Sequence, residues 1–137
     1  MKWIKGTGMF LAALLVLSSF AHSLGGLPPL QQALKQAGVE PGSELWIDAT
    51  AGWLFGSMSM LAFGIIFGSV VLSLSKTAVN LVPIVAIGLG YVVFGIGCLL
   101  MLHRGPHFVM FGVLGLLFLI WGWVAGRFAV ALREPKR

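Results

Sequence analysis

The strongest transmembrane signal of the chain is its central apolar stretch, residues 45–74. It reads LWIDATAGWLFGSMSMLAFGIIFGSVVLSL, and it contains no charged side chain after Asp48. A helix needs about 20 apolar residues to cross a bilayer. The stretch therefore predicts a transmembrane helix with more than a turn to spare.

The composition extends this interpretation to the whole chain. Of its 137 residues, 58% are hydrophobic and 9% are charged, whereas soluble domains carry roughly 25% charged residues. The net charge of +5 comes from basic residues grouped at the chain ends, as topology signals are. We therefore expect an integral membrane protein with no nucleic-acid partner and no separate soluble domain.

Three further apolar stretches accompany the central one, and they predict helices at about 6–24, 81–102 and 106–132. The connections at Lys76-Thr77 and at 103–107 are short, and short connections make consecutive helices antiparallel neighbours. Ser43 and Asn80 are suitable N-caps for the helices that follow them. The predicted fold is an all-α membrane protein, an antiparallel four-helix transmembrane bundle that forms one domain over 1–137.

The first stretch also has the features of a signal peptide. Lys2 and Lys5 precede a short apolar core, and Ala21-His22-Ser23 offers small residues where cleavage would occur. An uncleaved helix is the preferred interpretation. Cleavage would leave three helices, with the chain ends on opposite sides of the membrane.

The loop between the first two predicted helices, residues 25–43, contains a second helical pattern. Pro28-Pro29 opens it and Gly38 follows it, as proline and glycine do at the two ends of a helix. Leu30, Ala33, Leu34 and Ala37 fall on one face. We expect a short amphipathic helix in this outer loop that lies on the membrane surface or caps the bundle.

Lys and Arg residues set the predicted orientation. Two of them, Lys35 and Arg104, lie in the long loop and the second turn, and the other seven lie on the opposite side. Cytoplasmic segments are enriched in Lys and Arg. This bias predicts that both termini lie in the cytoplasm. The other seven are Lys2, Lys5, Lys76, Arg127, Arg133, Lys136 and Arg137.

In that topology, five polar residues come to the outer face: His22, Asp48, His103, Arg104 and His107. Each has an ordinary structural role as an alternative, such as an ion pair of Asp48 with Arg104 or a histidine. A carboxylate at the centre of a membrane helix costs about 2.5–3.5 kcal/mol, and less near the interface. We therefore expect Asp48 to lie close to one of these basic groups.

The loop histidines suggest two kinds of chemistry. The helix dipole favours a protonated His103 at a helix C-terminus and a neutral His107 at a helix N-terminus. Such a pair suits proton transfer or polarisation of a quinone carbonyl. Three histidines and a carboxylate could also bind a metal, but Gly105-Pro106 breaks the helical spacing between His103 and His107, so no metal ligands are assigned.

Glycines repeat at helical spacing inside the apolar stretches. Small residues four apart let helix backbones approach closely in membranes. The third stretch also repeats glycine at seven residues, as Gly88 with Gly95 and Gly90 with Gly97. The predicted helix-packing glycines are Gly52, Gly56, Gly64, Gly68, Gly122 and Gly126.

The helix number, the loop lengths and the stretch Ala21-His22-Ser23-Leu24-Gly25 resemble small four-helix bacterial membrane proteins of the DoxX-like type. That family includes subunits linked to quinone reduction. The resemblance implies a role for His22 and for no other residue.

The leading functional hypothesis is a multi-pass protein of a bacterial cytoplasmic (inner) membrane. It would act as an accessory or structural subunit that contacts membrane lipids and binds a larger membrane complex or another copy of itself. One alternative is an oxidoreductase subunit that binds a quinone or a lipid-like substrate at the outer face. A metal-binding membrane protein is the other. Whether the protein is an enzyme stays open at this point.

Overall fold

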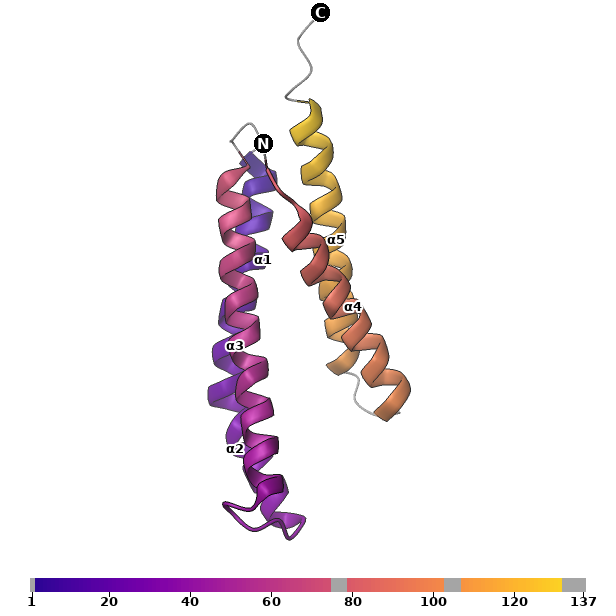
Figure 1. The fold of residues 1–137 in the computed structure, drawn as a ribbon. Coiled ribbons are helices and arrows are strands. Elements are labelled where there is room, and N and C mark those ends of the chain that lie inside the picture. Colours follow the sequence, from indigo (N-terminus) through magenta and orange to yellow (C-terminus); the bar gives the residue numbers. More distant parts are fainter. Residues whose placement is uncertain (1, 75–78, 103–106, 132–137) are drawn as a thin grey trace, which may run out of the picture. The chain divides into compact units, whose positions relative to one another are not determined.

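The computed structural model describes residues 2–74, 79–102 and 107–131, without the side chains of residues 102, 107 and 131. Within these ranges the structure is helical and has no strand. Four of its helical runs are long and apolar enough to cross a membrane. The elements are α1 (Lys2–Phe20), the π-helix η1 (Ala21–Gly25), α2 (Gly26–Gln36), α3 (Glu44–Ser73), α4 (Val82–Leu102) and α5 (His107–Ala131) (Figure 1).

The bounds of α3, α4 and α5 lie within one residue of the predicted ones, and both predicted N-caps are confirmed. The Ser43 hydroxyl accepts a hydrogen bond from the Trp46 N–H at 3.4 Å. The Asn80 side-chain oxygen accepts one from the Val82 N–H at 3.0 Å. Each cap satisfies a backbone donor that the first turn of a helix leaves free. The predicted turns at Lys76-Thr77 and at 103–106 lie outside the described residues.

The first helical run is longer than predicted. The sequence predicted a helix end near Leu24 and a loop over 25–43, but helical structure continues without a break from Lys2 to Gln36, and the connection to α3 spans only 37–43. Pro28 and Pro29 do not break the run. They lie in the first turn of α2, just after η1, a wide turn that changes the backbone hydrogen-bond pattern next to the two missing N–H donors.

The C-terminus of α2 is closed by glycine. Gly38 adopts φ +78°, in the left-handed region that a side chain disfavours. The N–H of Gly38 donates to the Lys35 oxygen at 3.0 Å, and the N–H of Val39 donates to the Leu34 oxygen at 3.0 Å. This pair of bonds is the Schellman arrangement, and it turns the chain back toward α3.

Contacts between residues divide the chain into two compact units. Unit 1 comprises Met1–Leu11 and Ile66–Arg137, and unit 2 comprises Ala12–Ile65. Unit 1 thus combines the start of α1 and the end of α3 with α4 and α5. Unit 2 contains the rest of α1, η1, α2 and the first two thirds of α3.

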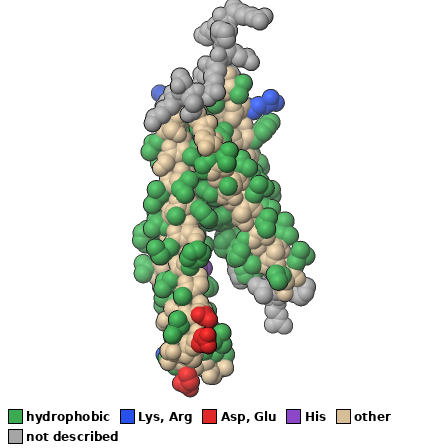
Figure 2. Space-filling model, viewed as in Figure 1, with side chains coloured by type: hydrophobic (Ala, Val, Ile, Leu, Met, Phe, Trp, Pro, Cys, Tyr) green, Lys and Arg blue, Asp and Glu red, His purple; other side chains and the backbone are tan. Residues whose placement is uncertain are grey.

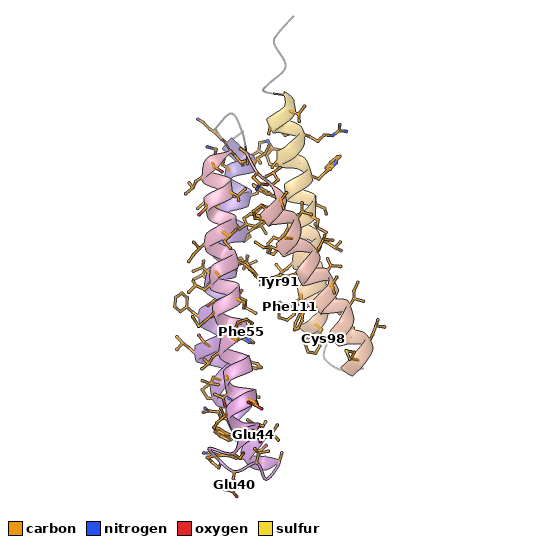
Figure 3. All side chains as sticks on the ribbon, in the orientation of Figure 1. Glu40, Glu44, Phe55, Tyr91, Cys98 and Phe111 are labelled. Carbon is orange, nitrogen blue, oxygen red and sulfur yellow. The ribbon has the colours of Figure 1, made fainter. Side chains whose placement is uncertain are left out.

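The core of unit 1 is aromatic. The Phe67 ring lies 5.2 Å from Phe118 and 4.9 Å from Trp121, centroid to centroid. Tyr91 meets Phe118 edge-on at 5.6 Å and Phe111 at 5.7 Å (Figure 3). Phe67, Phe118, Trp121 and Tyr91 are buried. Large aromatic side chains of α3, α4 and α5 therefore fill the interior of this unit.

Helices α4 and α5 pack antiparallel through glycine. A Cβ on Gly115 would lie 2.6 Å from the Gly88 oxygen, and a Cβ on Gly95 would lie 2.6 Å from the Gly112 nitrogen. The two backbones are thus in direct contact at two places along the helices. Such close approach supplies the packing that replaces the hydrophobic effect between helices in lipid.

The start of α1 and the last turns of α5 lie at the same end of unit 1. Trp3 meets Phe128 edge-on at 6.1 Å. The contact brings Lys2 and Lys5 to the end of the unit where Arg127 lies. Basic residues of α1 and α5 therefore lie at the same end of unit 1.

Unit 2 is an antiparallel helical hairpin (Figure 1). Gly64 packs on Val16, Gly56 faces His22, and Trp53 lies against Gly26. Beyond these pairs, the Lys35 ammonium lies 5.9 Å from the Trp46 ring centroid. The contacts thus run from Val16 with Gly64 to Lys35 with Trp46. Residue numbers rise along one arm as they fall along the other, so α2 lies along α3 and extends α1.

The connecting end of this hairpin is acidic. Figure 2 shows acidic side chains gathered there, whereas hydrophobic side chains are spread along the rest of the face in view. Glu40, Glu44 and Asp48 are exposed, and Figure 3 labels the first two at this end. Glu44 occupies the first turn of α3, where a negative charge is favourable.

Candidate functional site

Of the predicted site residues, His22 has the most distinctive surroundings. It lies in η1, where the backbone adopts the wide i→i+5 pattern instead of the α-helical one. Such π turns are rare in proteins, and those that occur are often found at functional sites. The Gly26 N–H donates to the His22 and Ser23 oxygens at the end of the turn, so the α-helical pattern resumes there.

Trp53 of α3 makes two contacts with His22. Its indole N–H donates a hydrogen bond to the backbone oxygen of His22 at 2.8 Å. Its ring also stacks on the His22 imidazole, with centroids 4.0 Å apart and planes 13° from parallel. The hydrogen bond contributes about 1 kcal/mol, and an aromatic pair contributes about 0.5–1.5 kcal/mol.

Two glycines lie against this pair of rings. A Cβ on Gly26 would run into the Trp53 ring, and a Cβ on Gly56 would lie 3.6 Å from the Nε2 atom of His22. The first contact excludes any side chain, whereas the second is an ordinary van der Waals distance. Gly26 is therefore the position that admits Trp53, and the half-buried His22 ring lies over Gly56.

A buried hydroxyl lies one turn before Trp53 on α3. The Oγ1 atom of Thr50 is buried and has no hydrogen-bond partner among the described residues. Thr50 differs in this from three serines of α3. The hydroxyls of Ser57, Ser59 and Ser73 donate to backbone oxygens of their own helix, those of Trp53, Phe55 and Val70.

The other predicted outer-face residues are not assembled into a described cluster. Asp48 is exposed on α3, and it makes no ion pair with any residue that the structure describes. His103 and Arg104 lie outside the described residues, as does the side chain of His107. The proximity of Asp48 to these groups stays a prediction.

Metal ligands do not gather in the described ranges either. No group of three or more His, Cys, Asp or Glu side chains could hold a metal ion within 2–74, 79–102 and 107–131. Cys98 is a free, half-buried thiol on α4 (Figure 3). Among the described residues, no set of metal ligands therefore supports the metal-binding alternative.

The predicted packing glycines differ in their surroundings. A Cβ on Gly64 would lie 2.7 Å from Val16 Cγ2 and 3.0 Å from the Ala12 oxygen. Gly122 and Gly126 of α5 face Ile84 and Leu81, each at 3.3 Å. Gly68 is buried. Gly52 has no heavy atom within 4 Å of its Cβ position.

Sequence reasoning missed the role of three tryptophan and glycine positions. Trp53 covers η1, and Trp121 is buried in unit 1, where its indole N–H donates to the backbone oxygen of Ile4. Gly26 was read as part of a loop. The available signal was that both prolines follow a Gly-Gly pair, which marks a place of close backbone approach.

Comparisons with protein-family models, with curated proteins and with solved structures find no match for this chain. The resemblance to DoxX-like proteins is therefore an expectation from the layout of the sequence.

Proposed function

We propose that this chain is a small accessory subunit of a bacterial cytoplasmic membrane, which binds a transmembrane helix of a second chain. That chain is a larger membrane protein or another copy. The four apolar helical runs support residence in a membrane. The shared end of Trp3 and Phe128 supports a topology with the basic segments, and both termini, on the cytoplasmic side.

The observation that carries the proposal is the pair of glycine rows on α4. Gly88 and Gly95 form one row, which meets the backbone of α5. Gly90 and Gly97 repeat the same seven-residue spacing on the opposite side, and nothing lies within 4 Å of their Cβ positions. The row of Gly88 and Gly95 contacts α5 within the molecule. The row of Gly90 and Gly97 has the same spacing, so it is suited to contact a helix of another chain.

The two rows provide matched variants for the test. The wild-type chain is extracted in mild detergent, and the protein mass of the particle is measured by light scattering. Gly90→Leu with Gly97→Leu should reduce the particle to a single chain and leave its thermal stability within a few degrees of wild type. Gly88→Leu with Gly95→Leu should unfold unit 1, because the leucines would meet the α5 backbone.

Two results would contradict the proposal. The first is a wild-type particle that contains one copy of this chain and no other protein. The second is an assembly whose mass is unchanged by leucine at positions 90 and 97. Identification of the proteins in the wild-type particle by mass spectrometry separates a larger partner from self-association.

A second candidate function is favoured by the His22 site. We propose as the alternative that the chain binds a quinone, with the stacked imidazole of His22 as hydrogen-bond partner of a quinone carbonyl. The support is the half-buried imidazole of His22, whose ring stacks on that of Trp53. Titration of the purified protein with a water-soluble short-chain quinone should quench Trp53 fluorescence in wild type and not in His22→Phe. Equal quenching in both proteins would exclude this site.

A further inference from the structure

The segment from η1 to the end of α2 is held in the hairpin by few contacts. Neither η1 nor α2 contains a buried residue, whereas α1 contributes Ile4, Ala12, Leu15 and Ser19 to the buried set. Segments with little buried surface are the first to change conformation. The contacts of Trp53 at η1 and of Trp46 with Lys35 are among those that hold this segment on α3.

The wide turn itself determines which face of α2 meets α3. The half-buried side chains of α2 after Gly26 are those of Leu27, Leu30, Gln31 and Leu34, at the i, i+3, i+4, i+7 spacing of a single helix face. A π turn carries one residue more than the α-helical turn it replaces. If η1 adopted the α pattern, everything after it would rotate by about 100°, and this apolar face would leave α3.

We propose that η1 is a two-state joint. In the observed state Trp53 locks the π turn, and in the released state η1 is α-helical and α2 presents Leu27, Leu30 and Leu34 outward. The lock has three parts, which are the indole hydrogen bond to the His22 oxygen, the stacked His22 ring and the absence of a side chain at Gly26.

The position of η1 along the first helical run indicates what would surround the released face of α2. The run Lys2–Gln36 has 35 residues, about 52 Å at 1.5 Å per residue, which exceeds the hydrocarbon thickness of about 30 Å. The exposed polar residues Gln32, Lys35 and Gln36 mark α2 as the part outside it. A released α2 is then an amphipathic helix whose apolar face is available to the membrane surface.

Spin-label distances on the full chain test the joint. In a Cys98→Ser background, labels at the exposed positions 32 and 58 report on α2 against α3, and labels at 17 and 58 report on α1 against α3. Trp53→Ala and Gly26→Ala should each create a second population in the 32–58 distribution, displaced by up to about 8 Å. This is the straight-line distance between the two positions of a side chain that lies about 5–6 Å from the helix axis and turns by 100° about that axis.

The controls lie next to the tested positions. Gly25→Ala should give the wild-type distribution, because its Cβ would meet no atom within 4 Å. The 17–58 distribution should stay unchanged in every variant, and helix content by circular dichroism should stay at the wild-type level, because a rotation keeps α2 helical.

Three results would overturn the proposal. An unchanged 32–58 distribution in both Trp53→Ala and Gly26→Ala would show that no second state exists. A loss of helix content would show that α2 melts instead of rotating. Equal broadening of the 17–58 and 32–58 distances would show that the whole hairpin loosens. Trp53→Phe, which keeps a ring and loses the N–H, should give a smaller second population than Trp53→Ala.

Discussion

The indole N–H of Trp121 donates a hydrogen bond to the backbone oxygen of Ile4 at 2.9 Å, across 117 residues of chain. Both residues are buried in unit 1, and the Trp121 ring also packs on Phe67. Gly8 permits this arrangement, because a Cβ there would run into the Trp121 ring. The bond ties the start of α1 to α5, so the start of α1 is part of the packed core of unit 1.

Two replacements of Trp121 separate the contribution of its hydrogen bond to stability from that of its ring packing. Trp121→Phe should lower the free energy of unfolding in detergent by about 1 kcal/mol for the lost bond, plus the cost of the smaller ring. Trp121→Ala should lower it by about 3–5 kcal/mol, the usual cost of deleting a buried aromatic side chain. Chemical denaturation monitored by circular dichroism measures both changes.

Trp123 provides the control for these variants. It is 65% exposed and contacts Arg127, whose guanidinium carbon lies 5.3 Å from the ring centroid. Trp123→Phe should change stability by no more than about 0.5 kcal/mol. Equal losses at positions 121 and 123 would show that the Trp121 contact with Ile4 does not stabilise the fold.

The α1 and α3 backbones should be sensitive to side chains at Gly64. Gly64→Leu should destabilise the hairpin by about 1–3 kcal/mol or more, as overpacking does, because its Cβ alone would press on Val16 and Ala12. Gly52→Leu should be tolerated, since nothing lies near its Cβ position. Thermal unfolding of the two variants in the same detergent compares them, and equal stability would show that Gly64 does not lie in the helix contact.

The crossing of α4 and α5 offers a sharper pair. Gly115→Ala adds one methyl group that would lie 2.6 Å from the Gly88 oxygen and 2.7 Å from the Val92 nitrogen. Backbone atoms cannot move aside as side chains do, so we expect a stability loss of about 1–3 kcal/mol. Gly112→Ala, with no atom within 4 Å of its Cβ position, should unfold at the wild-type temperature. A tolerated alanine at 115 would mean that the two helices lie farther apart.

The orientation can be tested with reporter fusions. A reporter after Arg137 should be active in the cytoplasm, and one inserted within 31–38 should be active on the outer side, as the distribution of Lys and Arg predicts. Sequencing of the mature N-terminus accompanies this experiment. A protein that begins near Leu24 would have lost Ile4 and Gly8, and we would then expect Trp121 to be exposed.

The sequence by itself determined the positions of the helical runs. Predicted bounds of 45–74, 81–102 and 106–132 compare with Glu44–Ser73, Val82–Leu102 and His107–Ala131. Apolar length and capping residues such as Ser43 and Asn80 are local properties, and local properties can be read from neighbouring residues. The end of the first run was missed for the same reason, because Gly25-Gly26 before Pro28-Pro29 has the local pattern of a break, whereas Trp53 stabilises the turn from another helix.

The tertiary structure alone decided which members of each repeated pattern make contact. Gly88 with Gly95 and Gly90 with Gly97 have the same spacing, but only the first pair meets α5. Trp53 and Trp123 both flank glycines, yet Trp53 covers His22 and Trp123 is exposed. A helix that is apolar on every side carries no sequence record of the face that meets its neighbour. Close packing of backbones makes that choice, and it depends on residues far away in the chain.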